Sequence, residues 1–493
     1  MRRPPQIGPL LAVVAAAAPL AAQEPPAAAV SRLVAVESAV VRLAAAHPDA
    51  IWPGFRPDTI PVLYAVAGRG VLLLNWPPDA GPPDGFALLP GFARAFWQGA
   101  DVRIAASTST ALGGRSAAQV VVAPDEGDAL LVGTTVHEAF HVFERSVARA
   151  GRRFGGTENS YLVTTYPVFD ARNEAGVALE GRLLARALAA RTLRDRREAA
   201  REFVAAREAR QRRLGREFAD FEVMLDLNEG LAEYALVRSL ELAEADARFP
   251  WRAQATELIA DHRARLDSLT SNVRLSLRAR SYAAGPAMGQ LLDRLAGPSW
   301  RSDLEREDRT LQDELAEASG YRDTERALLA RAAREVDTAA LDRDALRGVA
   351  RLRSLRRAQV DSVLAQPGLL LILRADSLPN RSFGVCGLDP QNLLQAGGGV
   401  LLHTRWLRPC GGGVAGDFRT AVVQDDAAGT FTAVVGPEDS VRVTAGGASV
   451  ALGDGEARVA EALRFDAPGA ALAVVRALVR KTGRTIEVTP LPR

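Results

Sequence analysis

The long stretch at residues 128–366 constrains the fold of this chain more than any other feature. Ala, Leu, Arg and Glu dominate it, and its apolar residues recur at the spacing of an α-helix. A Gly-Gly pair at 155–156 and a Gly-Pro pair at 297–298 interrupt the pattern. We therefore predict a domain of several long helices at residues 128–366.

Shorter β-rich segments flank this stretch on both sides. Residues 52–127 contain apolar runs such as 61–66 and 119–122, separated by Gly and Pro clusters, which is typical of a small sheet. From residue 367 to residue 493, Gly, Val and Thr dilute the helix-forming residues, and a separate β domain is expected there. The predicted fold class is α+β.

The first 22 residues have the features of a secretory signal peptide. Two arginines precede an apolar stretch at residues 7–22, which two prolines interrupt and which is shorter than the ~20 residues that span a bilayer. We expect cleavage after residues 1–22, and a short tether with a helix at residues 23–51. The mature protein is predicted to be exported, periplasmic or secreted, without a stable membrane span.

Charge excludes one class of partner. The chain has 61 basic and 59 acidic residues, with a net charge of +2, and no polybasic patch interleaved with aromatics. Nucleic acid is therefore not an expected partner. The Arg/Glu-rich stretch at residues 191–216 has charges of both signs, which favours a solvated helix face.

A length of 493 residues favours two or three domains.

The run HEAFH at residues 137–141 carries the strongest chemical signal. The chain has five histidines, and two of them are four apart with a glutamate directly after the first. On an apolar helix, His137 and His141 lie on one face and can reach one zinc ion. Glu138 can then accept a proton from a zinc-bound water, whose pKa the metal lowers to about 7. The alternative is a structural histidine pair on a buried helix.

A catalytic zinc usually has three protein ligands and one open position, so a third ligand is needed. The metzincin arrangement is excluded because Val147 stands where its third histidine would be. Two acids remain in play: Glu229, in the run LNEGLAEY at residues 227–234, and Glu180, in an apolar helical run at residues 178–184.

The run at residues 227–234 resembles the NEG(F/L)AxY segment of alanyl- and glycyl-aminopeptidase-type gluzincins, and the NExxSD segment of thermolysin-type enzymes. This resemblance implies that Glu229 is the third ligand and that Glu233 hydrogen-bonds a ligating imidazole. The run that starts at Tyr282 resembles the Tyr-x-Lys-Gly-Ala segment of the aminopeptidase-type enzymes. That resemblance implies that the Tyr282 hydroxyl stabilises the oxyanion of the reaction.

The resemblance implies a zincin-like catalytic domain at residues 128–366, preceded by the β-rich subdomain at 52–127 and followed by the C-terminal β domain at 367–493. Its function would be that of a zinc metallopeptidase with one Zn²⁺ per chain and a peptide or protein substrate. Enzymes of this class hold an extended peptide on the sheet before the zinc helix. No counterpart of the GxMEN motif occurs, so exopeptidase activity is not supported.

The remaining cysteines and histidines are expected to be structural. Cys386 and Cys410 are the two cysteines of the chain, and an oxidising compartment favours a disulfide between them. His47, His262 and His403 are each isolated, which favours surface or packing roles over metal binding.

Two other functions stay open at this point. The first is a catalytically inactive zinc-binding protein of the cell envelope. The second is a binding module that acts through its C-terminal β domain on a glycan or a protein.

Overall fold

The computed structural model describes residues 25–92, 94–99, 107–271, 277–322, 325–376 and 383–491, so the expected signal peptide lies outside the described residues. These residues separate into two compact units. The first contains the described residues up to Phe143 and Ser239–Thr256, and the second contains Glu144–Arg238 and Glu257–Arg493. The expected mixture of helix and sheet is confirmed. In the described ranges, no helix is long and apolar enough to cross a membrane.

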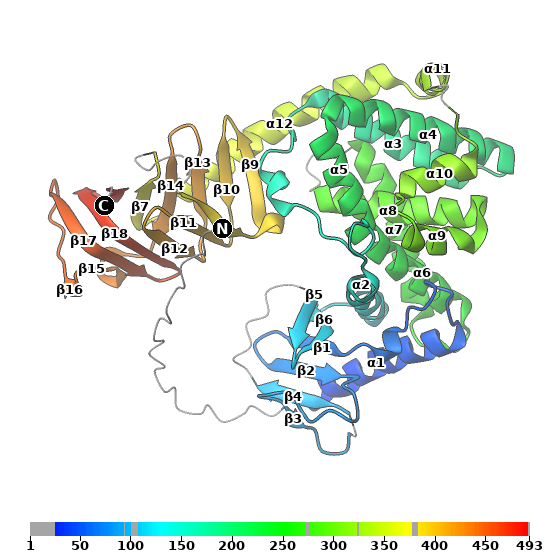
Figure 1. The fold of residues 1–493 in the computed structure, drawn as a ribbon, viewed down its shortest axis with the longest axis horizontal. Helices are drawn as coiled ribbons and strands as arrows, with labels where there is room; N and C mark the ends of the chain where they lie inside the picture. Colours follow the sequence, from blue (N-terminus) through cyan, green and yellow to red (C-terminus); the bar gives the residue numbers. More distant parts are fainter. Residues whose placement is uncertain are drawn as a thin grey trace, which may run out of the picture. The chain divides into compact units, whose positions relative to one another are not determined.

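The first unit is built on a six-stranded sheet with the order β3-β4-β2-β1-β6-β5, in which β1 and β6 are parallel. Helix α1 (Ala27–Ala46) lies along this sheet (Figure 1). Its buried residues Leu33, Val36 and Val40 recur at helical spacing, which explains the packing. The strands are β1 (Val62–Val66), β2 (Gly70–Leu74), β3 (Ala87–Leu88), β4 (Phe96–Gly99), β5 (Thr108–Leu112) and β6 (Arg115–Val122).

Helix α2 (Asp128–Val147) follows β6 and carries the HEAFH run. The rings of Trp52 and Phe55 each pack on Phe140 of α2 with centroids 5.3 Å apart. On the same helix, the Thr135 hydroxyl lies 2.9 Å from the hydroxyl of Tyr64 on β1. These contacts hold α2 in a fixed orientation on the first unit.

Helices continue along the chain as far as Leu364, close to the expected end of the helical stretch. Several begin with a side-chain cap, such as Asp170 before α3 and Thr192 before α4. The helices are α3 (Ala171–Ala189), α4 (Leu193–Leu214), α5 (Arg216–Leu225), α6 (Leu231–Ala245), α7 (Arg252–Ser271), α8 (Leu277–Leu295), α9 (Trp300–Arg306), α10 (Leu311–Ser319), α11 (Glu325–Glu335) and α12 (Thr338–Leu364).

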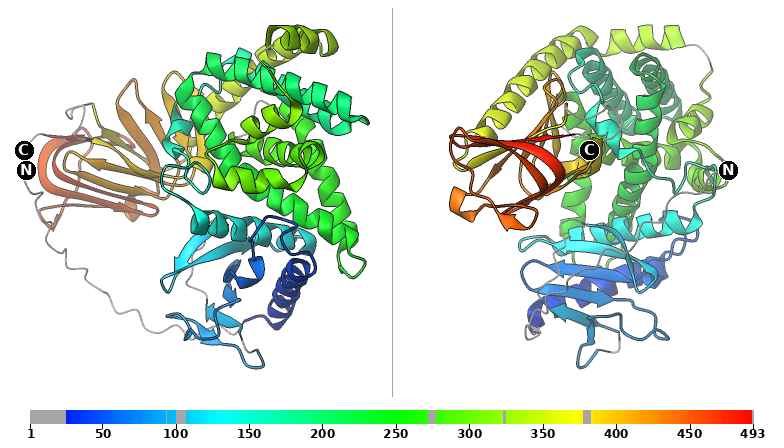
Figure 2. Two further views of the ribbon diagram at one scale, coloured as in Figure 1. Left: turned by 45° about the vertical axis from the view of Figure 1, so that its right-hand side comes forward. Right: turned by 60° about the vertical axis from the view of Figure 1, so that its left-hand side comes forward.

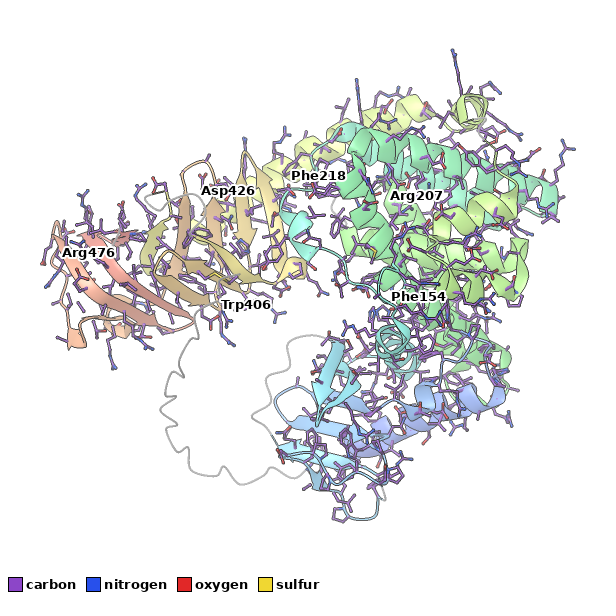
Figure 3. The ribbon with its side chains drawn as sticks, in the orientation of Figure 1. Phe154, Arg207, Phe218, Trp406, Asp426 and Arg476 are labelled. Carbon is purple, nitrogen blue, oxygen red and sulfur yellow. A yellow bond between two sulfur atoms is a disulfide. The ribbon has the colours of Figure 1, made fainter. Side chains whose placement is uncertain are left out.

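Part of α4 departs from the expected solvated face. Arg207, which Figure 3 labels among the helices, and Arg210 are only 4% and 3% exposed. Arg210 binds Glu180 on α3 and Glu222 on α5, and Arg207 binds Asp226. Burial alone would raise the pKa of Glu222, but the charge and hydrogen bonds of Arg210 lower this pKa to about 2. The predicted solvated face was therefore wrong at these two arginines. Buried charges of opposite sign can form ion pairs, and these pairs replace the water that each charge loses on burial.

The C-terminal part forms a 13-stranded sheet, whose main path runs β16-β15-β17-β18-β19-β7-β14-β13-β10-β9. Strands β17 and β18 form a long curved hairpin (Figure 2). The strands are β7 (Leu369–Arg374), β8 (Phe383–Leu388), β9 (Leu393–Gly397), β10 (Val400–His403), β11 (Leu407–Gly411), β12 (Val414–Phe418), β13 (Val422–Asp425), β14 (Thr430–Val435), β15 (Arg442–Ala445), β16 (Ala448–Ser449), β17 (Ala457–Ala467), β18 (Ala470–Thr482) and β19 (Thr485–Pro490).

A disulfide joins Cys386 on β8 to Cys410 on β11, with Cα atoms 5.8 Å apart. The two strands are antiparallel neighbours, and Cys410 is paired in register with Gly384. The disulfide therefore links two adjacent strands that lie off the main path of the sheet.

Candidate metal site

His137 and His141 face each other on α2. Each is 7% exposed, and their Nε2 atoms lie 3.2 Å apart. Two nitrogens that each lie 2.0–2.1 Å from a tetrahedral zinc would be separated by about 3.3 Å. The separation of the two Nε2 atoms therefore matches that of two nitrogens bound to one zinc ion.

Glu229 lies in a π-helical turn, η3 (Asp226–Gly230), between α5 and α6. Such turns are rare and frequently occur at functional sites. One ligand atom from each of His137, His141 and Glu229 lies within 4.8 Å of the others, and all three residues are buried. The rival acid, Glu180, is engaged instead by Arg210. Of the two expected third ligands, it is Glu229 that the structure brings to the histidines.

This donor set suits a divalent transition metal. Two imidazole nitrogens and one carboxylate oxygen are the three-ligand set of many catalytic zinc sites, which keep a fourth position for water. Glu138, next to the first histidine, is itself only 6% exposed.

Two glycines bring α8 close to the turn that carries Glu229. A Cβ atom on Gly285 would lie 2.3 Å from the Cα atom of Gly230. A Cβ atom on Gly289, one helical turn later, would lie 2.3 Å from the ring of Tyr234. Only glycine fits at either position without a shift, so Gly285 sets the distance between α8 and the Glu229 turn, and Gly289 sets the distance between α8 and α6.

The same face of α8 presents Tyr282 and Arg278 to Glu229. The Tyr282 hydroxyl donates to Oε2 of Glu229 across 3.0 Å, and Arg278 Nη1 donates to Oε1. Burial, and then the negative charge of Glu229, raises the pKa of Tyr282 above its usual range. The hydroxyl therefore stays protonated at neutral pH and acts as a hydrogen-bond donor.

Sequence reasoning missed two partners of this group, Arg278 and Glu158. Arg278 Nη2 donates to Oε1 of Glu158, and the side chain of Asn228 donates to Oε2 of Glu158 across 2.6 Å. The available signal was the four-residue step from Arg278 to Tyr282, which puts both on one helix face. No sequence signal pointed to Glu158, because its role depends on the tertiary contact.

Glu233 and the isolated histidines have the following surroundings. Oε1 of Glu233 lies 2.7 Å from Nη1 of Arg265 and 3.5 Å from Nδ1 of His262. His262 is 7% exposed, His47 ends α1, and His403 is buried in β10. In the part of the chain that the structure describes, none of these three histidines belongs to a group that could hold a metal. The role expected for Glu233 stays a prediction.

Comparison with protein-family models, with curated proteins and with solved structures found no match to this chain. The buried cluster of His137, His141 and Glu229 is the structural basis for a metal site in this chain.

Proposed function

We propose that this chain is an exported, zinc-dependent metallopeptidase of the gluzincin type that hydrolyses peptide bonds. The observation that carries the proposal is the convergence of His137, His141 and Glu229 in one buried cluster. Glu229 is distant in sequence from the two histidines, and the three residues match the ligand types of a catalytic zinc site.

The residues around the cluster are suited to peptide hydrolysis. A bound zinc would supply a water of pKa about 7 and polarise the peptide carbonyl. Glu138 would accept the proton of the attacking water and pass it to the leaving amine. The protonated Tyr282 hydroxyl, which donates to Glu229 in the free protein, would turn to donate its hydrogen bond to the developing oxyanion. Glu233 would orient a ligating imidazole, as the sequence resemblance implies.

The sheet of the first unit offers a surface for an extended substrate. Strand β5 is an edge strand and pairs on one side with β6. An exposed edge provides backbone donors and acceptors that an extended peptide can pair with. This supports a peptide or protein substrate and a zincin-like arrangement of the catalytic domain.

The direct test measures zinc and turnover together. Mature protein, purified without metal and then reconstituted, should retain one zinc per chain by elemental analysis and should cleave an unstructured protein such as casein. Glu138→Gln should keep the zinc and lose turnover by at least about 100-fold. Glu217→Gln, at an exposed position of α5, is the matched control and should be unaffected.

Two outcomes contradict the proposal in different ways. Absence of stoichiometric zinc would remove the metal site itself. Zinc without turnover in the unaltered protein, and indifference to Glu138→Gln, would favour the inactive zinc-binding envelope protein.

A binding role of the C-terminal sheet is the second candidate. A cavity of about 680 Å³ in this region contains Lys481, the one lysine of the chain, which pairs with Glu438. Its volume is in the range of about 300 to 1,000 Å³ that small-molecule sites occupy. Lys481→Met in the full chain should weaken glycan or protein binding if this candidate is correct, and should leave peptide hydrolysis unchanged.

A further inference from the structure

A second cavity, of about 260 Å³, adjoins the residues that hold Glu229. Tyr282 and Arg278 form part of its wall, and both donate hydrogen bonds to Glu229. The cavity therefore begins one side chain away from a member of the metal cluster. A group bound there would lie next to the position where chemistry is proposed.

Most of the remaining wall is apolar. It contains Val163, Phe221, Leu225 and Leu277. Three of these belong to a buried apolar cluster with Tyr166, against which Phe218, labelled in Figure 3, also packs. The cavity thus borders a packed apolar cluster. An apolar group that binds there would transfer its surface from water to an apolar environment, which is favourable.

The C-terminal part of the chain closes this cavity. Pro390 and Gln391, in the turn η5 (Pro390–Asn392) before β9, line it. Gln395 on β9 fixes the turn, because its Nε2 atom donates to the backbone oxygens of Val163 and Tyr166, each across 2.8 Å. Without this turn, the apolar wall would be open on one side.

The charged groups of the cavity are already engaged with one another. Arg278 binds Glu158 and Glu229, and the second oxygen of Glu158 accepts from Asn228. An acidic side chain entering the cavity would meet the Glu158 carboxylate, and a basic one would have to displace Arg278 from it. A neutral, apolar side chain leaves this network intact.

We propose that this cavity receives a large apolar side chain of the peptide substrate beside the scissile bond, and that Pro390 and Gln391 of the C-terminal region complete it. The inference rests on the proposed peptidase function. The cavity is smaller than the about 300 to 1,000 Å³ of drug-sized sites, so its volume suits one side chain. The C-terminal sheet then takes part in substrate selection.

The experiment compares hydrolysis of quenched fluorescent peptides that differ at one residue: Phe, Leu, Ala, Glu or Lys. The zinc-loaded full chain should show kcat/KM at least about tenfold higher for Phe and Leu than for the others. Ser160→Trp and Gln391→Trp fill the cavity from two different turns that line it, at half-buried and exposed positions. Each should lower kcat/KM for Phe and Leu about tenfold and leave that for Ala within about threefold.

Gln366→Trp is the matched control, because Gln366 is exposed and does not line the cavity. It should keep the preference of the unaltered chain. Hydrolysis without a preference, or a preference that survives both filling variants, overturns the inference and leaves the peptidase proposal intact. Hydrolysis of no peptide contradicts the peptidase proposal and the inference together. Circular dichroism checks that each variant folds, and the two variants serve as independent tests.

Discussion

Tyr282 donates its hydroxyl hydrogen to Oε2 of Glu229 across 3.0 Å. The bond joins α8 to the π-helical turn, and it fixes the orientation of a carboxylate that also lies within reach of two imidazoles. The hydroxyl has one hydrogen, so it can either position Glu229 or, after turning away from Glu229 when substrate is bound, donate to a developing oxyanion.

Tyr282→Phe separates these two roles. We expect kcat to fall by about 100-fold, in the range for loss of one oxyanion donor, while zinc affinity changes by less than about tenfold. Steady-state kinetics and zinc competition with a chelator measure the two quantities. A large loss of zinc affinity with unchanged kcat in the loaded protein would show that Tyr282 acts only on Glu229.

Glu229→Ala and Glu180→Ala form a matched pair for the third ligand. Glu229→Ala should weaken zinc binding by more than about 100-fold, because it removes a ligand. Glu180→Ala should retain zinc but lower the free energy of unfolding by about 1.5–3 kcal/mol, since Arg210 loses one buried carboxylate partner and keeps Glu222. Elemental analysis and urea unfolding measure these effects. If Glu180→Ala loses the zinc and Glu229→Ala retains it, Glu180 is the third ligand.

Gly285→Ala tests the close packing of α8 on the Glu229 turn. Because its Cβ atom would lie 2.3 Å from Gly230 Cα, the backbone must move, and we expect a loss of about 1–3 kcal/mol in the free energy of unfolding. Zinc affinity should fall as well, since the movement displaces Glu229. Gly81→Ala, where the added atom meets nothing within 4 Å, is the control and should change stability by less than about 0.5 kcal/mol.

Because of the buried Glu37 carboxyl, we expect the free energy of unfolding to depend on pH. Burial, only partly offset by hydrogen bonds from Tyr64 and Asn75, raises the pKa of Glu37 from 4.5 to about 7. The folded state therefore binds more protons than the unfolded state between these values, so stability falls as the pH rises from 4.5 to about 7. The free energy of unfolding should fall by about 3 kcal/mol over this range. Above it, the Glu37 contribution no longer changes with pH.

Glu37→Gln should remove this fall and make the first unit more stable than the unaltered protein at pH 8. The neutral amide oxygen can still accept from Asn75, and the amide nitrogen can donate to the Tyr64 oxygen once that hydroxyl turns from Glu37 to Thr135. Urea unfolding at pH 5 and pH 8 measures the difference. Parallel pH profiles for the two proteins would contradict the raised pKa.

Local periodicity and composition determined much of this protein. The apolar spacing of residues 128–366 predicted helices, and the β-rich texture at both ends predicted sheets, because these patterns depend on near neighbours. The facing of His137 and His141 also follows from the four-residue step of one helix. Two candidates for the third ligand remained because spacing along the chain does not measure distance in space.

Only the tertiary structure decided between them. Glu229, and not Glu180, lies in one cluster with the histidines, and its turn is held by packing of Gly230 on Gly285 of α8, a contact between segments far apart in sequence. The burial of Arg207 could not be predicted from the sequence either. The same mixed-charge pattern occurs on a solvated helix face and in a buried network in which the charges are paired. Sequence alone specified which groups could bind a metal, and the packing of distant segments decided which of them meet.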